Sequence, residues 1–422
     1  MKLDETTLFL PCAGGAEALL ADEVQRITGR PAEATRGGVW VEGDAGTAMQ
    51  LNLESRLAQR VLWPLIDGHY RDEHDLYDIA RHVAWGDWIT PAQTLRVDVN
   101  ARLSPLRSLN FAALRIKDAV CDVLRDATGE RPSVDTHHPD LPLMLYLGPE
   151  HATLYVDTSG EALFKRGWRD AQRGKLGRDD VKGEAPLKET LAAAMLASAG
   201  WQGRAEDGPL FDPCCGAGTI AIEAAQMACG IAPGAMRRFA FERMLPFKDL
   251  MADWQALQNA ARARVHAPAV PIFAGDVSFR MTDFATRNAA RAGVGHAIEF
   301  KTADALQRLA PAAAGTLMLN PPYGERIAAK GTGSGTEARL GTSVGAPHGR
   351  EDFDGGGSSA AFYAGLAQNW KRHYAGWTAW VLSPDMKLPS LLRLKESRRV
   401  PMWNGPIECR LLRFDLVAGS AR

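Results

Sequence analysis

The second half of the chain alternates helix patterns with short apolar runs, and this alternation restricts the fold more than any other feature of the sequence. The helix patterns cover residues 187–198, 219–227, 283–292 and 359–373, and the apolar runs cover residues 208–212, 270–274, 317–319 and 377–382. Helices that alternate with strands in this way predict an α/β domain built on a mostly parallel, doubly wound sheet. Ligands of such a sheet bind beyond the carboxyl ends of the strands, where the strand order reverses.

Two smaller α+β units are expected before this sheet, because 422 residues exceed what one hydrophobic core usually serves. Residues 1–65 show strand, helix, strand and helix patterns and are expected to form a unit complete in itself, and residues 66–160 form a second unit of this kind. Residues 161–184 are rich in Lys and Arg and predict an exposed basic connector, with an ordinary solvated linker as the equal alternative. The α/β domain then covers residues 185–422, and its glycine-rich stretch 328–358 is expected to be a flexible insertion.

Charge and cysteine usage narrow the functional class. The chain has 49 Lys and Arg against 50 Asp and Glu, so its overall field does not attract a polyanion and any contact with nucleic acid must be local. Its six cysteines include no Cys-x-x-Cys pair and no His at metal-ligand spacing. The sequence has no apolar run long enough to cross a membrane and no secretory leader at its start. These features predict a cytoplasmic protein that uses no metal and has no membrane partner.

A glycine-rich loop follows the apolar run 208–212. It has the sequence DPCCGAG over residues 212–218, and a helix pattern begins directly after it. Glycine permits a tight turn and a close approach of the backbone to a ligand, and the first turn of the helix presents free N–H groups. The loop lacks the Gly-Lys-Ser/Thr of a Walker loop and, with Ala221, the third glycine of the dinucleotide fingerprint. It predicts a polar ligand, with a ligand-free turn as the alternative.

Acidic residues follow the next two expected strands. Asp276 comes after the run 270–274, and Asp304 follows the strand-like residues 298–301. A carboxylate in the first position is suited to accept hydrogen bonds from both ribose hydroxyls of an adenosine group, and one in the second position from an adenine amino group. A helix or turn cap is the alternative for each residue.

The motif Asn320-Pro321-Pro322-Tyr323 follows the apolar run 317–319 and is the most informative one in the chain. Two successive prolines fix a rigid turn without backbone donors, which leaves the Asn320 side chain and the Pro321 carbonyl as two acceptors for one planar amine. The ring of Tyr323 is suited to stack on an extruded base. An apolar turn is the alternative, but the position at a strand end favours a site that acts on a base.

In this order, the motifs resemble those of class I S-adenosylmethionine-dependent methyltransferases that act on exocyclic amines. Residues 185–189, 232–242, 320–326 and 404–409 resemble the THUMP-domain RNA guanine-N2 methyltransferases, in particular the bacterial 23S rRNA enzymes. The resemblance covers most of the chain. It implies a Rossmann-like class I methyltransferase domain preceded by a ferredoxin-like domain and a THUMP RNA-binding domain.

The resemblance also implies roles for individual residues. The residues that would bind the cofactor, S-adenosylmethionine, are Asp212, Cys214, Gly216, Gly218, Asp276, Asp304 and Asn320. The residues that would hold and stack the guanine are Asn320, Pro321, Pro322 and Tyr323. His137 and His138 could contact a phosphate or cap a surface loop.

The expected function is methylation of the N2 amine of a guanine in RNA, with 23S rRNA favoured over tRNA and the protein acting as a monomer. A tRNA guanine-N2 methyltransferase is the first alternative, and a non-catalytic RNA-binding or ribosome assembly factor is the second. A DNA amine methyltransferase is disfavoured by the N-terminal domains that the resemblance implies. Some relatives carry a second methyltransferase domain at the C-terminus, which this chain is expected to lack.

Overall fold

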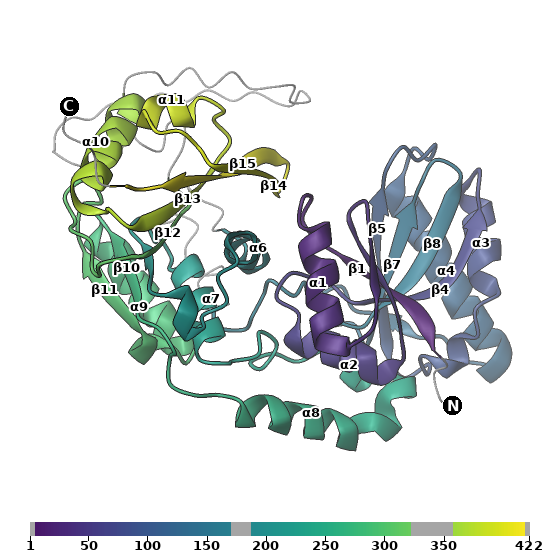
Figure 1. The fold of residues 1–422 in the computed structure, drawn as a ribbon. Coiled ribbons are helices and arrows are strands. Elements are labelled where there is room, and N and C mark those ends of the chain that lie inside the picture. Colours follow the sequence, from purple (N-terminus) through teal and green to yellow (C-terminus); the bar gives the residue numbers. More distant parts are fainter. Residues whose placement is uncertain (1–4, 170–186, 322–357, 418–422) are drawn as a thin grey trace, which may run out of the picture.

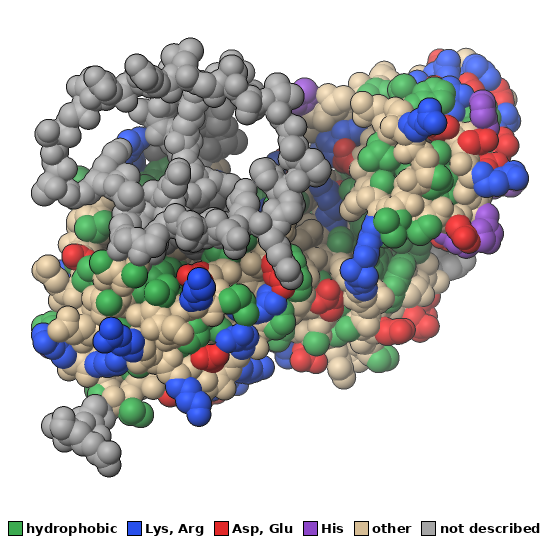
Figure 2. Space-filling view, turned by 90° about the horizontal axis from the view of Figure 1, so that it is seen from above, with side chains coloured by type: hydrophobic (Ala, Val, Ile, Leu, Met, Phe, Trp, Pro, Cys, Tyr) green, Lys and Arg blue, Asp and Glu red, His purple; other side chains and the backbone are tan. Residues whose placement is uncertain are grey.

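The computed structural model describes residues 5–169, 187–321 and 358–417, which form two lobes that face each other (Figure 1). The N-terminal lobe is built on an eight-stranded sheet and the C-terminal lobe on a seven-stranded sheet. Seen from above, Lys and Arg side chains lie in the recess between the lobes (Figure 2). Among the described residues, no helix combines the length and the apolar character that a membrane crossing requires.

The N-terminal sheet runs without a break through both expected α+β units. Its strands, in spatial order, are β2 (Ala32–Thr35), β3 (Gly38–Gly43), β1 (Thr6–Pro11), β4 (Leu62–His69), β8 (His151–Asp157), β7 (Leu141–Leu147), β5 (Thr94–Ala101) and β6 (Ser133–Val134). Strand β4 pairs with β1 at one end and with β8 along most of its length. Strand β4 extends past residue 65 and both units hydrogen-bond to it, so one sheet joins them. The expectation that residues 1–65 form a unit complete in itself stays a prediction. The boundaries near residues 65, 160 and 184 stay predictions.

Strand β4 shows little strand signal in the sequence. Pro64 cannot donate to a ladder, and Asp67 and Gly68 are uncommon in strands. The ladder between β4 and β8 accordingly shifts its register between Pro64 and Ile66. The pairing compensates for the weak local preference, so tertiary structure decides the conformation here.

Helices cover the sheet of the N-terminal lobe, and most of them begin at polar caps. They are α1 (Glu17–Thr28), α2 (Ala45–Glu54), α3 (Glu73–Arg81) and α4 (Leu109–Thr128), and the short 3-10 helix η1 covers Trp85–Asp87. Asp44, Asp72 and Ser108 accept backbone N–H groups at the starts of α2, α3 and α4. Such caps satisfy donors that the first helical turn leaves free.

In the C-terminal sheet, the order in which the strands follow one another along the chain reverses at the middle of the sheet. Its strands, in spatial order, are β11 (Ile298–Thr302), β10 (Ile272–Asp276), β9 (Leu210–Asp212), β12 (Gly315–Leu319), β13 (Trp377–Ser383), β15 (Ile407–Asp415) and β14 (Arg398–Asn404). The pairs from β11 to β13 are parallel, and β15 is antiparallel to both of its neighbours. The predicted mostly parallel α/β sheet is confirmed.

Helices cover both faces of this sheet, which makes it doubly wound. They are α6 (Glu189–Ala199), α7 (Thr219–Ala228), α9 (Phe279–Arg291), α10 (Ser358–His373) and α11 (Leu388–Leu392). Helix α8 (Met251–Ala263) lies away from this sheet, and the 3-10 helices are η2 (Ala205–Asp207), η3 (Ala240–Arg243), η4 (Leu245–Leu250) and η5 (Gly295–Ala297). Neighbouring residues of β9 face opposite ways: Leu210 packs in the core cluster of α6, α7 and α9, and Phe211 packs in that of α10 and α11. Strands buried on both faces explain the continuous apolar runs in the sequence.

A buried ion-pair cluster connects the two lobes. Glu223 of α7 is fully buried and accepts from Arg166 at 2.9 Å and from Arg56 at 3.2 Å. Trp168 is also buried. The expectation of an exposed connector is therefore wrong for Arg166 and Trp168, because the guanidinium neutralises a buried carboxylate. Residues 170–186 and the expected flexible insertion at residues 328–357 lie outside the described residues.

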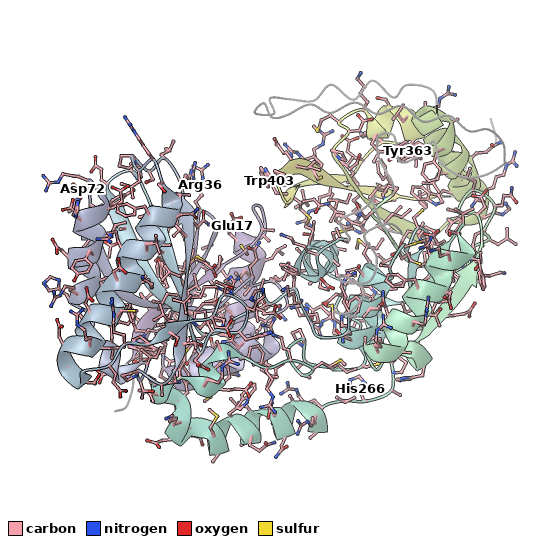
Figure 3. The ribbon with its side chains drawn as sticks, turned by 180° about the vertical axis from the view of Figure 1, so that it is seen from behind. Glu17, Arg36, Asp72, His266, Tyr363 and Trp403 are labelled. Atoms are coloured by element: carbon pink, nitrogen blue, oxygen red, sulfur yellow. The ribbon has the colours of Figure 1, made fainter. Side chains whose placement is uncertain are left out.

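The hairpin of β14 and β15 reaches the N-terminal lobe, and Figure 3 shows Trp403 near Glu17 of α1. A Cβ placed on Gly14 would lie 3.0 Å from the indole ring of Trp403, so the ring packs directly on this glycine. At the other end of the junction, α8 lies along α2 (Figure 1), and Arg264 pairs with Glu54.

Candidate active site

The candidate site lies where the strand order reverses, between β9 and β12. Leu317 of β12 pairs with Phe211 of β9, and both strands run in the same direction. Asp212 is the last residue of β9, and Asn320 directly follows β12. The two side chains therefore come to the same edge of the sheet, at the position where ligands of doubly wound sheets bind.

The glycine-rich loop is fixed to the end of the neighbouring strand β10. The N–H of Cys215 donates to the carbonyl of Gly275 at 2.8 Å, and the N–H of Gly216 donates to a carboxylate oxygen of Asp276 at 3.1 Å. Within the loop, the N–H of Cys214 donates to Asp212 at 3.2 Å. The loop is thus held in one conformation before any ligand binds.

The two loop glycines differ in what surrounds them. Gly216 has φ 51°, and a Cβ there would meet no atom within 4 Å. Gly218 has φ 83°, and a Cβ there would lie 3.0 Å from the Cβ of Ala285 on α9. Gly216 therefore leaves open space beside the backbone, as a ligand cradle requires, whereas Gly218 allows close packing of helix and loop.

Three carboxylates surround the loop, and their charges reach the thiol of Cys214. Burial raises the pKa of this thiol well above its usual range, and the charges of Asp212, Asp276 and Asp304 add to the shift. Burial, together with the charge of Asp276, raises the pKa of Asp212 to about 8. No ion pair joins these three acids in the part of the chain that is described, so the site is suited to a cationic ligand.

Asp276 and Asp304 each use one oxygen as a turn cap. Asp276 accepts the N–H of Ser278 at 2.9 Å, and Asp304 accepts the N–H of Leu306 at 2.9 Å. The cap alternative is therefore part of each residue's role. An ionised carboxylate offers about four acceptor sites, so both residues retain acceptors for a ligand. Asp304 also borders a cavity of about 550 Å³.

Asn320 carries a buried acceptor without a partner. Its Oδ1 is inaccessible to solvent and makes no hydrogen bond to any residue within 5–169, 187–321 and 358–417. An unsatisfied buried polar atom costs about 1–3 kcal/mol, so it indicates a role in binding or catalysis. Pro321 is buried. Pro322 and Tyr323, the remaining residues of the predicted guanine site, lie outside the described residues.

Two contacts at this site were not predicted from the sequence. Asn288, buried on α9, donates to the carbonyl of Ala217 in the loop at 2.9 Å. Arg169 of the connector donates to the hydroxyl of Thr219, the first residue of α7, at 2.8 Å and pairs with Glu189 at the start of α6. An Asn on the buried face of an amphipathic helix is a signal that could have been noticed. The Arg169 contact has no local sequence signal.

The cysteines and the acids of this site form no metal centre. Within residues 5–169, 187–321 and 358–417, no group of three His, Cys, Asp or Glu is arranged to hold a metal ion. All six cysteines are free, and Cys214 is the partly exposed one.

Three family models match the chain in sequence order. An RlmL ferredoxin-like domain matches residues 7–62, a THUMP domain matches residues 70–157, and a methyltransferase domain described as RMKL-like matches residues 177–340. The chain carries all three of these domains. The predicted resemblance to THUMP-domain methyltransferases is thereby confirmed.

Curated relatives share this arrangement over almost the whole chain. The ribosomal RNA large subunit methyltransferase K/L of Shewanella amazonensis is 34% identical, with 98% of this chain and 54% of the relative covered. The protein of the same name from Syntrophotalea carbinolica is 35% identical, with 97% and 53% covered. This THUMP-domain methyltransferase chain thus spans about half the length of the curated relatives that it matches.

Solved structures share the fold at full length. SMU.472, a candidate methyltransferase solved in complex with SAH, matches with a TM-score of 0.81 and 24% identity, and both chains are covered completely. TrmN from Thermus thermophilus matches with a TM-score of 0.62 and 18% identity over 98% of this chain and 100% of its own. These likenesses support the arrangement of both lobes.

Proposed function

We propose that the protein transfers a methyl group from S-adenosylmethionine to the exocyclic N2 amine of a guanine in RNA, with 23S rRNA as the substrate. The three matched domains and the names of the curated relatives support this proposal. The observation that carries it is the unpaired Oδ1 of Asn320 at the sheet edge, beside three carboxylates. An acceptor without a partner fits an amine that arrives with the substrate.

The residues around the loop fit the cofactor. S-adenosylmethionine supplies an electrophilic methyl group on a positively charged sulfur. A positively charged ligand favours the ionised form of Asp212, whose pKa is raised to about 8, and Gly216 leaves room for the ligand beside the backbone. We assign the ribose to Asp276 and the adenine amino group to Asp304, each through the acceptor sites that the turn caps leave free. Cys214 and Gly218 complete the wall of the site.

Asn320 and Pro321 would prepare the amine for transfer. The lone pair of a guanine amine is delocalised into the ring, which makes the amine a poor nucleophile. Acceptance of its two N–H groups by Asn320 Oδ1 and the Pro321 carbonyl directs the lone pair toward the methyl group, and positioning of this kind lowers a barrier by several kcal/mol. Positive charge develops on the amine nitrogen, so the same two acceptors stabilise the transition state. From sequence alone, we assign the stacking of the base to Tyr323 and the rigidity of the turn to Pro322.

We further propose that the protein acts in the cytoplasm as a monomer and without a metal ion. Six cysteines that all remain free thiols support a reducing compartment. Sedimentation of the purified chain tests the oligomeric state, and retention of activity in a chelator tests the absence of a metal.

Transfer of tritiated methyl groups to total RNA from a strain that lacks the gene tests the proposed reaction. We expect label in 23S rRNA, recovered as N2-methylguanosine after nucleoside analysis. Label confined to tRNA would instead identify a tRNA enzyme. Absence of label from every RNA, together with absence of cofactor binding in calorimetry, would leave a non-catalytic RNA-binding or ribosome assembly factor.

A further inference from the structure

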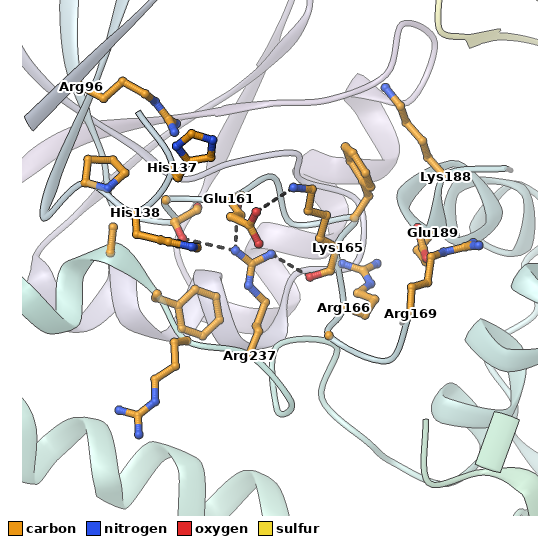
Figure 4. Close-up of a pocket in the computed structure, with 18 of the residues that line it drawn as sticks. Arg96, His137, His138, Glu161, Lys165, Arg166, Arg169, Lys188, Glu189 and Arg237 are labelled. Carbon is orange, nitrogen blue, oxygen red and sulfur yellow. Dashed lines mark hydrogen bonds and ion pairs between the residues drawn. The ribbon is translucent and has the colours of Figure 1, made fainter. Parts of the chain in front are cut away.

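A second cavity lies at the junction of the lobes and is distinct from the candidate active site. It measures about 780 Å³, and the three carboxylates around the loop are not part of its wall. The N-terminal lobe contributes Arg96, His137 and His138, and the C-terminal lobe contributes Lys188 (Figure 4). Arg238 also lines the cavity, from the segment between α7 and η3. We call this cavity the junction cleft. A ligand bound in it contacts both lobes at once.

The junction cleft is strongly basic in a chain whose net charge is -1. Eight Lys and Arg residues line it, against two Glu residues. Several of these cations have acidic partners that do not line the cleft: Arg96 pairs with Asp98 and Arg238 with Glu242. A guanidinium carries five N–H donors, so one ion pair leaves donors for a ligand. Lys188 makes no ion pair among the described residues, and its ammonium lies 5.1 Å above the ring of Phe164.

The floor of the cleft is built before any ligand binds. Arg237 lies there with its guanidinium largely buried, and it donates to four backbone carbonyls, those of Ser159, Glu161, Ala162 and Lys165. Burial lowers the pKa of Arg237 to about 10, but the group remains charged at neutral pH. This arginine fixes the segment that carries Lys165, so it acts as a positioning residue. The cations at the rim of the cleft, such as Lys188, are the ones placed to contact a ligand.

One residue of the cleft wall contacts the start of α7, directly after the cofactor loop. Arg169 lines the cleft and also donates to Thr219, the residue directly after Gly218. The cleft wall and the start of α7 are therefore linked through one side chain. His137 and His138 also lie in the cleft wall. Asp135 accepts their backbone N–H groups and so caps the loop that carries them, which leaves both rings at the wall of the cleft.

We propose that the junction cleft binds the phosphodiester backbone of the substrate RNA, with Lys188, Arg238 and His138 in contact with phosphates. This inference rests on the proposed RNA methylation and adds where the backbone of that RNA lies. Contacts to phosphates from Lys and Arg position a nucleic acid without reading its sequence. They supply affinity that depends on salt, since each contact releases a condensed counterion.

The test compares a triple variant, Lys188→Ala with Arg238→Ala and His138→Ala, with a control outside the cleft, Arg287→Ala with Lys371→Ala. Arg287 pairs with an acid four residues away, Asp283, as Arg238 does with Glu242, and Lys371 stands for Lys188, so the control removes the same two types of charge. Fluorescence anisotropy with a fluorescein-labelled RNA stem-loop gives the dissociation constant at several salt concentrations. We expect the triple variant to bind roughly tenfold more weakly, with a salt slope reduced by about two, and the control to match the wild type.

Calorimetry with S-adenosylmethionine and thermal unfolding verify that each variant is folded, and we expect both to be unchanged. Equal RNA affinity and equal salt slope in the triple variant and the control would overturn the proposal. So would binding of inorganic phosphate in the cleft with RNA binding unaltered by the substitutions. A wild-type protein that binds RNA through the cleft but transfers no methyl group would reject the proposed function and leave the binding site standing.

Discussion

The core of the N-terminal lobe and the edge of the C-terminal sheet differ in how their buried polar groups are hydrogen-bonded. In the N-terminal lobe, Glu23 is buried but accepts from the hydroxyl of Ser55 and from the backbone N–H groups of Arg56 and Leu57. At the edge of the C-terminal sheet, buried Asp212 accepts from Cys214, and Asn320 Oδ1 accepts from no group among the residues that the structure describes. Seven buried side-chain atoms lack a partner among the described residues, and six of them lie beyond residue 160.

This difference separates polar groups that hold the fold from polar groups that await a ligand. Burial of a polar group is tolerated when hydrogen bonds replace the lost water, as they do around Glu23. The groups at the C-terminal sheet edge lack that replacement, so their desolvation is offset only when a ligand arrives. The comparison predicts loss of stability when a satisfied group is altered, and loss of function when an unsatisfied one is altered.

The strongest test of this contrast is Glu223→Gln at the junction of the lobes. Glu223 is buried and fully paired, so it belongs with the satisfied groups. Removal of its charge leaves Arg56 and Arg166 without their partner, and breaking a buried pair costs about 3–5 kcal/mol. Urea denaturation measures the free energy of unfolding. Glu206→Gln, which alters an exposed pair with Arg204, is the control and is expected to change little.

Asn320→Ala is the opposite case and is expected to abolish activity with little change in stability. Loss of an acceptor that acts in the transition state lowers kcat by about 10²–10³. Cofactor affinity is expected to stay near the wild-type value in calorimetry. Asn259→Ala on α8, an exposed position, serves as the control. Full turnover by the Asn320 variant would end the assignment of this residue.

Substitution of the two loop glycines separates packing from binding within a single loop. Gly218→Ala introduces a methyl group against Ala285 at φ 83°, where a side chain costs about 1–2 kcal/mol. Gly216→Ala introduces one into open space at φ 51°, so a smaller loss of stability and a larger loss of cofactor affinity are expected. Thermal unfolding and calorimetry on both variants measure the two effects. The reverse order would contradict the cradle at Gly216.

The pH dependence of cofactor binding gives the smallest predicted effect. The pKa of Asp212 is raised to about 8, so the folded protein binds this proton more tightly than the unfolded chain does. The free energy of unfolding therefore falls as pH rises from about 4 to about 8, and this group adds no further change above that range. A cationic ligand favours the ionised form, so affinity for S-adenosylmethionine is expected to rise through pH 8. Asp212→Asn is expected to flatten both profiles, and an unaltered affinity profile in this variant would show that Asp212 does not meet the ligand.

The sequence was sufficient for elements with a local signal. The apolar runs that became β9, β10 and β12 are buried on both faces, so their composition alone predicts strands. Their order placed Asp212 and Asn320 at one edge of the sheet. The hairpin of β14 and β15 was missed, although its two turn residues, Gly405 and Pro406, begin with a glycine, which is a recognised hairpin signal, and Gly405 has φ 63°.

The remaining features depend on contacts between distant residues. Gly216 and Asp276 are 60 residues apart in sequence, and only the parallel pairing of β9 with β10 brings them together. Arg166 meets Glu223 through the packing of two lobes, so a segment that is polar in the sequence becomes part of the interior. Periodicity reports which face of an element is apolar, and it contains no information on such pairings.

The contact of Trp403 with Gly14 has a mechanical consequence. The indole braces the lobes at one end of their junction, and the pair of Arg264 and Glu54 braces them at the other. A joint fixed at two separated points resists rotation about either one. The distance between His138 in the cleft wall and Asn320 at the sheet edge is consequently fixed by the protein. This distance selects the molecules that can reach both residues at once.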